Sequence, residues 1–164
     1  MSDPRVVGSG EGEAYVLLGS EHITFKRKGV PGEECSIFEN ATRAGYQGPS
    51  PHLHHNQDED FYVLEGRFEF RVQGRTAEGG PGTFVHSPKG TVHTFRNVGE
   101  GDGKLLVTVS PAGGFEDVVE EFGKPTQEES PPLRSGAPDA ATAERYAAVA
   151  SKHGIEMVPS SSDH

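Results

Sequence analysis

The stretch that decides the fold is residues 51–66, PHLHHNQDEDFYVLEG. It contains the spacing His-x-His-x4-Glu, formed by His52, His54 and Glu59. Alternate residues of a β-strand lie on the same face, so His52 and His54 project the same way from a short strand. A turn through residues 55–58 brings Glu59, at the start of a second strand, toward the same point. Two imidazoles and a carboxylate suit a divalent transition metal, so this stretch predicts a metal site.

A second stretch, residues 82–97, GTFVHSPKGTVHTFRN, strengthens the prediction of a metal site. Its Pro-x-Gly turn joins two short apolar runs and places His93 on a strand, on the same face as Thr91 and Phe95. On its own, the first stretch also fits a solvated polar loop, because His, Glu and Asp side chains are mostly exposed. The two stretches together favour a metal site over that alternative.

Taken as a pair, the two stretches resemble the paired motifs of the cupin superfamily. These motifs read G-x5-H-x-H-x3,4-E-x6-G and G-x5-P-x-G-x2-H-x3-N. The second motif fits at every fixed position, whereas the first lacks its leading glycine, where Tyr46 stands between Gly45 and Gly48. That departure affects a turn and not a ligand. The 15 residues between the motifs, 67–81, also resemble the short spacing of small bacterial cupins.

The resemblance implies an all-β fold, a small antiparallel cupin β-barrel of the double-stranded β-helix or jelly-roll type, with C-terminal helices. It also implies one divalent transition metal ion per chain, with His52, His54, Glu59 and His93 as the ligands by motif position. This ligand set does not name the ion, which could be Fe, Ni, Mn, Co, Cu or Zn, because divalent affinities follow the Irving–Williams order. His55 follows His54 directly, so strand alternation turns it away from the metal.

Apolar side chains at alternate strand positions predict the wall of a substrate pocket. Each of these side chains is an even number of residues from a candidate ligand or from another inward position on its strand. The expected pocket residues are Phe61, Phe68, Phe70, Phe84, His86 and Phe95. A mostly aromatic wall favours a flat or aromatic organic molecule over a sugar phosphate. The same phenylalanines would form the core of any such barrel, whatever its function. His86 is expected inside the barrel, as a hydrogen-bonded histidine and not as a fifth ligand.

The pattern of strand and helix signals divides the chain into three segments. Residues 1–12 are small and polar and predict a flexible N-terminal arm. Residues 13–111 contain short alternating runs separated by turns, which is typical of a barrel. Residues 112–164 predict a helical appendage that packs on the barrel or joins a dimer. We therefore expect one cupin domain with a C-terminal extension.

Two helices and one ambiguous segment are expected in the C-terminal extension. Residues 115–122 repeat their apolar side chains at helical spacing. Asp139 is the predicted N-cap of a second helix that continues through His153. Residues 155–158 fit either a last strand or a packed extension.

Composition limits the partners of the protein. Its 164 residues carry a formal net charge of −10, which disfavours binding to nucleic acid or to an anionic membrane. The single cysteine, Cys35, excludes an internal disulfide, and no signal-peptide pattern or transmembrane run is present in the sequence. These features predict a cytoplasmic protein with a small-molecule partner, and the resemblance suggests a homodimer.

The chain as a whole resembles the single-domain cupins related to quercetin 2,3-dioxygenase, including SPAGGFEDVVEEFG at residues 110–123 and HGIEMVP at residues 153–159. The resemblance implies a metal-dependent dioxygenase acting on a flavonol-like or other aromatic or enolic small molecule, with Glu59 also the catalytic base. One alternative is a cupin that binds a small metabolite without turnover. Another is a metal-dependent isomerase or decarboxylase, which needs further acid–base groups in the pocket, and His86 is the visible candidate.

Overall fold

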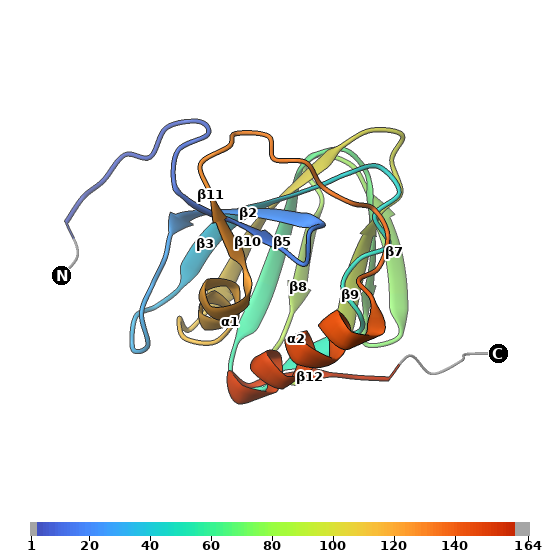
Figure 1. Ribbon diagram of the computed structural model, residues 1–164. Helices are drawn as coiled ribbons and strands as arrows, with labels where there is room; N and C mark the ends of the chain where they lie inside the picture. Colours follow the sequence, from blue (N-terminus) through green and yellow to red (C-terminus); the bar gives the residue numbers. More distant parts are fainter. Residues whose placement is uncertain (1–2, 160–164) are drawn as a thin grey trace.

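The computed structural model describes residues 3–159, which form two facing β-sheets and two short helices (Figure 1). The larger sheet has the order β11-β1-β2-β3-β10-β5-β8. Its strands are β1 (Glu13–Leu17), β2 (Glu21–Arg27), β3 (Ser36–Thr42), β5 (Asp58–Glu65), β8 (Phe84–Ser87), β10 (Gly103–Ser110) and β11 (Lys124–Thr126).

The smaller sheet has the order β12-β4-β9-β6-β7. Its strands are β4 (His52–His54), β6 (Phe68–Val72), β7 (Arg75–Gly79), β9 (His93–Asn97) and β12 (Ile155–Met157). Every strand pairing within residues 3–159 is antiparallel. The predicted all-β, antiparallel architecture is therefore confirmed.

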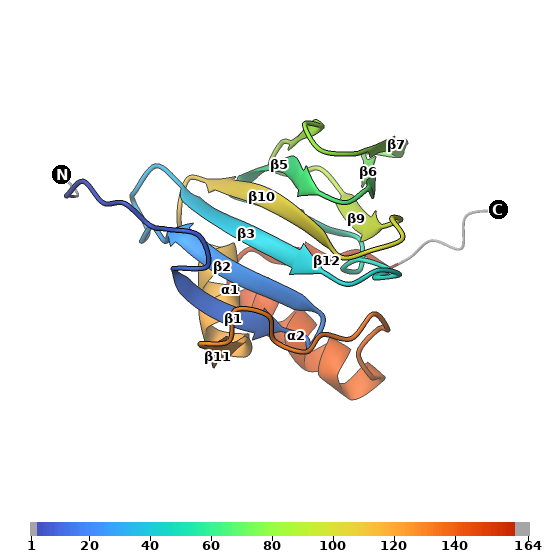
Figure 2. The same cartoon turned by 90° about the horizontal axis from the view of Figure 1, so that it is seen from above.

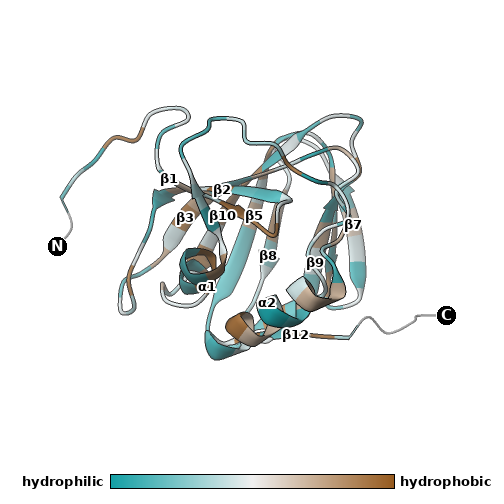
Figure 3. Ribbon diagram, viewed as in Figure 1, coloured by the Kyte–Doolittle hydropathy of each residue, from teal (hydrophilic) through white to brown (hydrophobic). Residues whose placement is uncertain are grey.

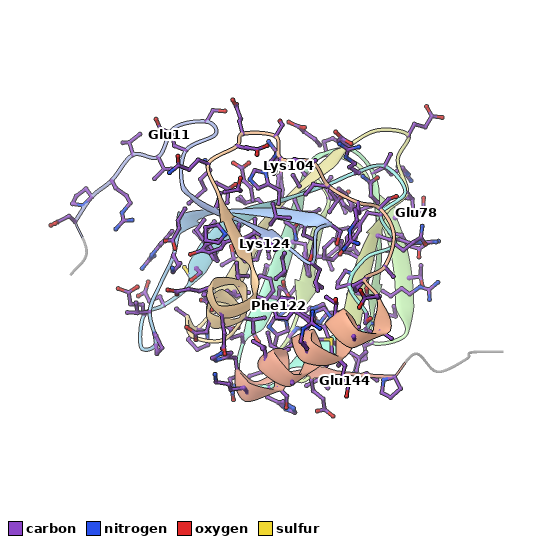
Figure 4. All side chains as sticks on the ribbon, viewed as in Figure 1. Glu11, Glu78, Lys104, Phe122, Lys124 and Glu144 are labelled. Atoms are coloured by element: carbon purple, nitrogen blue, oxygen red, sulfur yellow. The ribbon has the colours of Figure 1, made fainter. Side chains whose placement is uncertain are left out.

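The core between the sheets is built largely from aromatic side chains on alternate strand positions. Phe61, Phe68, Phe70 and Phe95 are all buried, and their ring centroids lie 5.6–6.5 Å apart. Burying each such ring stabilises the fold by roughly 1.5–3 kcal/mol relative to leaving it exposed. Four of the charged side chains labelled in Figure 4 are exposed, namely Glu11, Glu78, Lys124 and Glu144.

Both helices lie on the same side of the molecule, beside β1 and β11 (Figure 2). They are α1 (Phe115–Phe122) and α2 (Ala140–Lys152). The Asp139 side chain accepts a hydrogen bond from the Thr142 backbone N–H at 2.8 Å, which confirms the predicted N-cap of α2. Hydrophobic and hydrophilic residues alternate along α2 (Figure 3), and its buried side chains are Tyr146 and Ala150. Neither described helix is long and apolar enough to cross a membrane.

The C-terminal extension adds one strand to each sheet. β12 pairs with β4, with Ile155 opposite His54, so residues 155–157 form the strand and not merely a packed extension. β11 pairs with β1, and the sequence did not predict it. The extension therefore supports a strand that carries two of the candidate metal ligands.

The N-terminal segment from residue 3 to residue 12 has no regular secondary structure. The Lys26 ammonium donates hydrogen bonds to the carbonyl oxygens of Gly8, at 2.9 Å, and Glu11, at 2.7 Å. These bonds hold the segment against β2. The flexibility expected for residues 1–12 stays a prediction, and residues 1–2 lie outside the described range.

Candidate metal centre

Three strands bring His52, His54, Glu59 and His93 together inside the barrel. His52 and His54 are the two inward residues of β4, Glu59 is on β5, and His93 lies directly opposite His52 on β9. One ligand atom from each side chain lies within 4.8 Å of all the others, and the side chains are buried. The larger sheet thus contributes the carboxylate and the smaller sheet the three imidazoles.

Backbone carbonyl groups orient two of the imidazole rings. The Nδ1 atom of His52 lies 2.7 Å from the Ser50 carbonyl oxygen, so this nitrogen donates and Nε2 is left free. The Nδ1 atom of His93 lies 3.0 Å from both the Thr91 carbonyl oxygen and the Ser87 hydroxyl. In both rings, Nε2 is consequently the nitrogen that is available to a metal ion.

The carboxylate of Glu59 lies between the other two imidazoles. Its Oε2 atom is 3.0 Å from Nε2 of His54 and 2.8 Å from Nε2 of His93. Yet neither ring nitrogen of His54 has a hydrogen bond of good geometry to any of residues 3–159. Buried polar atoms without partners are costly, and a cation bound by His54 and Glu59 would give Nε2 of His54 a partner. These residues therefore fit a divalent transition metal ion.

The electrostatics of the cluster suit a metal ion as well. Burial, together with repulsion from His93 and His54, lowers the pKa of His52 to about 3, so this ring is neutral at physiological pH. Burial by itself would raise the pKa of Glu59, but the charges and hydrogen bonds of His54 and His93 bring it well below its usual range. Burial opposes charge on His93 too, whereas the Glu59 carboxylate raises its pKa. The raised pKa means that the carboxylate favours a proton on His93. A bound divalent cation would replace this proton, since metal ligands must be deprotonated.

His55 faces away from the cluster, as its place next to His54 predicts. Its side chain is exposed, and its Nε2 atom lies 2.9 Å from the Glu156 carboxylate.

The prediction that Phe84 and His86 line the interior is wrong. Phe84 is 60% exposed, and His86 lies outside, where it is hydrogen-bonded to Asp60. The cause is the register between β8 and β5, in which Ser87 pairs with Glu59 and Val85 with Phe61. Directly paired residues share a face of the sheet, so the inward residues of β8 are those of the opposite parity.

Two residues that support the centre were missed from the sequence. Ser87 is buried and contacts the imidazole of His93, but its inward position follows only from the register of β8.

Gln57, the second of these residues, lies in the expected polar turn, yet it is buried. Its amide donates to the Pro111 carbonyl oxygen at 2.8 Å and to Glu116 at 3.1 Å, and it accepts from the Phe115 N–H at 2.9 Å. Gln57 thus fixes the turn between His54 and Glu59 to the start of α1.

Aromatic rings surround the cluster to different degrees. The ring of Phe61 lies 5.9 Å from that of His93, and the ring of Phe115 lies 6.2 Å from that of His54. Phe68, Phe70 and Phe95 pack on one another in the core. Their role as walls of a substrate pocket stays a prediction.

Comparison with known proteins places the barrel in a family. The cupin domain model matches residues 42–109, the segment that holds all four candidate ligands. Residues 42–109 are a cupin domain. Quercetin 2,3-dioxygenase of Bacillus subtilis (strain 168) is 30% identical to this chain over 125 residues, which cover 74% of the chain and 35% of the dioxygenase. The chain thus spans about a third of the length of that curated relative.

Solved structures support the cupin jelly-roll fold. The structure of KdgF from a Halomonas species has a TM-score of 0.58 at 20% identity, covering 67% of this chain and 94% of that one. An RmlC-like cupin from Shewanella frigidimarina has a TM-score of 0.57 at 22% identity, covering 67% and 93%. These likenesses establish the fold of the chain and do not identify a substrate.

Proposed function

We propose that the protein is a metal-dependent cupin dioxygenase that acts on a flavonol-like or other aromatic or enolic small molecule. The observation that carries this proposal is the buried cluster of three imidazoles and one carboxylate, whose ligand atoms lie within 4.8 Å of one another. The similarity to quercetin 2,3-dioxygenase supports the reaction class. The rings of Phe61 and Phe115 beside the cluster support an aromatic substrate.

The side chains of the centre have distinct tasks in this proposal. A redox-active divalent ion, when bound, supplies positions at which a substrate oxygen and dioxygen can bind. His52, His54 and His93 hold the ion, and the Ser50 and Thr91 carbonyl groups orient two of these rings. Neighbouring aromatic rings exclude water.

Glu59 is both a ligand and the proton acceptor for a substrate hydroxyl. Because its pKa is lowered well below the usual range, Glu59 is a weak base. It therefore accepts a proton only from a hydroxyl whose acidity is raised at the centre.

The alternatives differ in what the centre does with a bound molecule. His86 was the acid–base group that the sequence offered for an isomerase or decarboxylase, and its place outside the barrel removes that support. A non-catalytic metabolite-binding cupin would use the same ligands without oxygen uptake. The homodimer and the absence of nucleic-acid or membrane partners stay predictions.

Metal analysis of protein purified without added metal, followed by oxygen uptake with a panel of flavonols, tests the proposal. We expect a redox-active ion at about one per chain and oxygen uptake with at least one flavonol. Zinc without uptake would contradict the dioxygenase and favour the binding or isomerase alternatives.

The matched variants are His54→Ala and His55→Ala, which remove neighbouring imidazoles on opposite faces of the strand. We expect His54→Ala to lose most of the metal, because it removes one of four ligands, and His55→Ala to keep it. The reverse result would mean that the strand register is shifted by one residue.

A further inference from the structure

The inner face of the larger sheet carries a second set of buried polar side chains, apart from the metal ligands. This polar set consists of Glu21 on β2 and Asn40 and Thr42 on β3, which are 4%, 3% and 1% exposed. The amide nitrogen of Asn40 donates a hydrogen bond to the Glu21 carboxylate at 2.8 Å.

Two oxygen atoms of the polar set lack any partner. Oδ1 of Asn40 and Oγ1 of Thr42 are buried and have no hydrogen bond to any of residues 3–159. A buried acceptor without a partner costs stability, and a leucine or valine would fill the same space without that cost. Packing therefore does not explain these two side chains, whereas a bound molecule that pairs with them does.

The polar set and the metal centre face the same interior. Ser36 of β3 pairs with Val109 of β10, and Val109 also pairs with Glu59, so Ser36 and Glu59 lie on the same face of the larger sheet. Asn40 has the same parity on β3 as Ser36 and is buried on that face too. The charge of Glu59 also acts on Glu21 directly. One small molecule can consequently meet the metal ligands at one end and the polar set at the other.

A pocket borders α2 near the polar set. Its volume is about 430 Å³, within the range of small-molecule sites, and Ser20, Tyr46, Tyr146 and Met157 are among its lining residues. Tyr46 also interacts with Glu21 through a side-chain hydrogen bond. Tyr46 therefore borders both the pocket and the polar set.

We propose that Glu21, Asn40 and Thr42 form a second ligand subsite, which binds a hydroxyl group of the molecule whose other end reaches the metal centre. This inference rests on the proposed function, because it assumes a small molecule in the barrel. A hydroxyl group donates and accepts, so it satisfies the Asn40 oxygen or the Thr42 hydroxyl. A phosphate or carboxylate offers only acceptors to these oxygens and is repelled by an ionised Glu21. The subsite should thus bind neutral, hydroxylated molecules more tightly than molecules that carry a phosphate or carboxylate at this position.

The test uses two flavonols that differ by a single hydroxyl group remote from the chelating oxygens. Their dissociation constants are measured by calorimetry on the metal-loaded protein under argon, so that binding is separated from turnover. We expect the wild type to bind the hydroxylated flavonol roughly tenfold more tightly, the size of one buried hydrogen bond. Thr42→Val and Asn40→Leu should abolish this preference and leave the metal content unchanged.

Thr24→Val is the matched control for Thr42→Val. Thr24 lies on β2 with the opposite parity to Glu21, and it lines with His22 and Lys26 a pocket on the other face of the sheet, which Thr42 also borders at the end of β3. The same chemical change on the outer side of the sheet should leave the preference between the flavonols intact. An equal loss in both variants would overturn the subsite.

Thermal unfolding of the same variants gives a readout that needs no ligand. Thr42→Val should unfold at the wild-type temperature or above it, because it removes a buried oxygen without a partner. A lower midpoint would mean that the hydroxyl has a structural partner, and would overturn the subsite.

The outcomes separate this inference from the proposed function. Equal binding of both flavonols to the wild type overturns the subsite and leaves the dioxygenase standing. Hydroxyl-dependent binding without oxygen uptake overturns the dioxygenase and leaves the subsite standing. If neither flavonol binds, the subsite for a flavonol hydroxyl is overturned, and the dioxygenase would have to act on a different aromatic or enolic molecule.

Discussion

At the residue scale, the barrel contains two buried carboxylates whose environments differ. Glu59 lies against His54 and His93, and its pKa is lowered well below the usual range. Within residues 3–159, no cationic side chain lowers the pKa of Glu21, and burial raises it to about 7, although hydrogen bonds from Asn40 and Tyr46 oppose the shift. At neutral pH, Glu59 is therefore ionised, whereas Glu21 is close to its midpoint.

Glu59→Gln separates the ligand role of Glu59 from its role as a base. Glutamine preserves the shape and one carbonyl oxygen but is not a comparable base. We expect the variant to keep a substantial part of the metal and to lose most of the turnover per bound metal. Metal content and oxygen uptake are measured on the same preparation. Full turnover per bound metal would show that Glu59 is a ligand only.

Glu21→Gln should change the pH dependence of stability. The pKa of Glu21 is raised in the folded protein from about 4.5 to about 7, so the fold favours its protonated form. Its favourable contribution is complete below pH 4.5 and is lost as the pH rises through 7. The free energy of unfolding of the variant, relative to that of the wild type, should therefore increase by up to roughly 3 kcal/mol between pH 4.5 and 8. Urea unfolding of both proteins across this range measures the difference, and a constant difference would contradict the assignment.

At the element scale, the turn between β4 and β5 is held by α1 through one buried amide. Gln57 bonds to Pro111, Phe115 and Glu116, and the Glu116 carboxylate also accepts a hydrogen bond from Ser36 of β3 at 2.6 Å. Since this turn separates His54 from Glu59, its position sets how closely the two ligands approach.

Gln57→Leu should weaken metal binding without touching a ligand. Leucine leaves the Glu116 carboxylate and the Phe115 N–H without the partner they have in the wild type, so we expect a loss of about 1–3 kcal/mol of stability. The turn should also become less ordered and the metal affinity lower, which chelator competition measures. The exposed Gln127→Leu is the control and should behave as the wild type. Wild-type metal affinity in Gln57→Leu would show that the turn does not depend on α1.

At the scale of the whole molecule, the metal centre joins the two sheets. Glu59 belongs to the larger sheet, whereas His52, His54 and His93 belong to the smaller one. An ion bound by all four residues links the two layers across the core, and it binds the folded protein only, because the unfolded chain does not hold these ligands together.

Removing the metal should lower the unfolding midpoint of the protein. A free ion at a hundred times its dissociation constant stabilises the fold by about 2.7 kcal/mol, and a chelator removes that contribution. Calorimetry of the metal-loaded and chelator-treated wild type measures the shift. His54→Ala is the control, since a protein that no longer holds the ion should unfold at the same temperature in both conditions. An unchanged wild-type midpoint would show that the ion does not stabilise the closed barrel.

Local sequence signals were enough to predict the class of fold, the four candidate ligands and the start of the second helix. Each of these depends on signals within a short window. The spacing of His52, His54 and Glu59 places their side chains through strand alternation, and Asp139 caps α2 through a contact only three residues away. The position of His93 needed a second motif, but its Pro-x-Gly turn is equally local.

The inward face of β8 and the identity of the buried polar residues depend on contacts between segments that are distant in the sequence. The run Phe84-Val85-His86-Ser87 has two apolar residues followed by two polar ones, so it contains no alternation from which a face could be chosen. Its orientation comes from pairing with β5, which lies about 26 residues away along the chain. Likewise, Glu21 is a charged residue at the start of β2, where the local sequence pattern predicts exposure to solvent. In the structure it is buried. Burial depends on what packs against a segment, and segments distant in the sequence supply that packing.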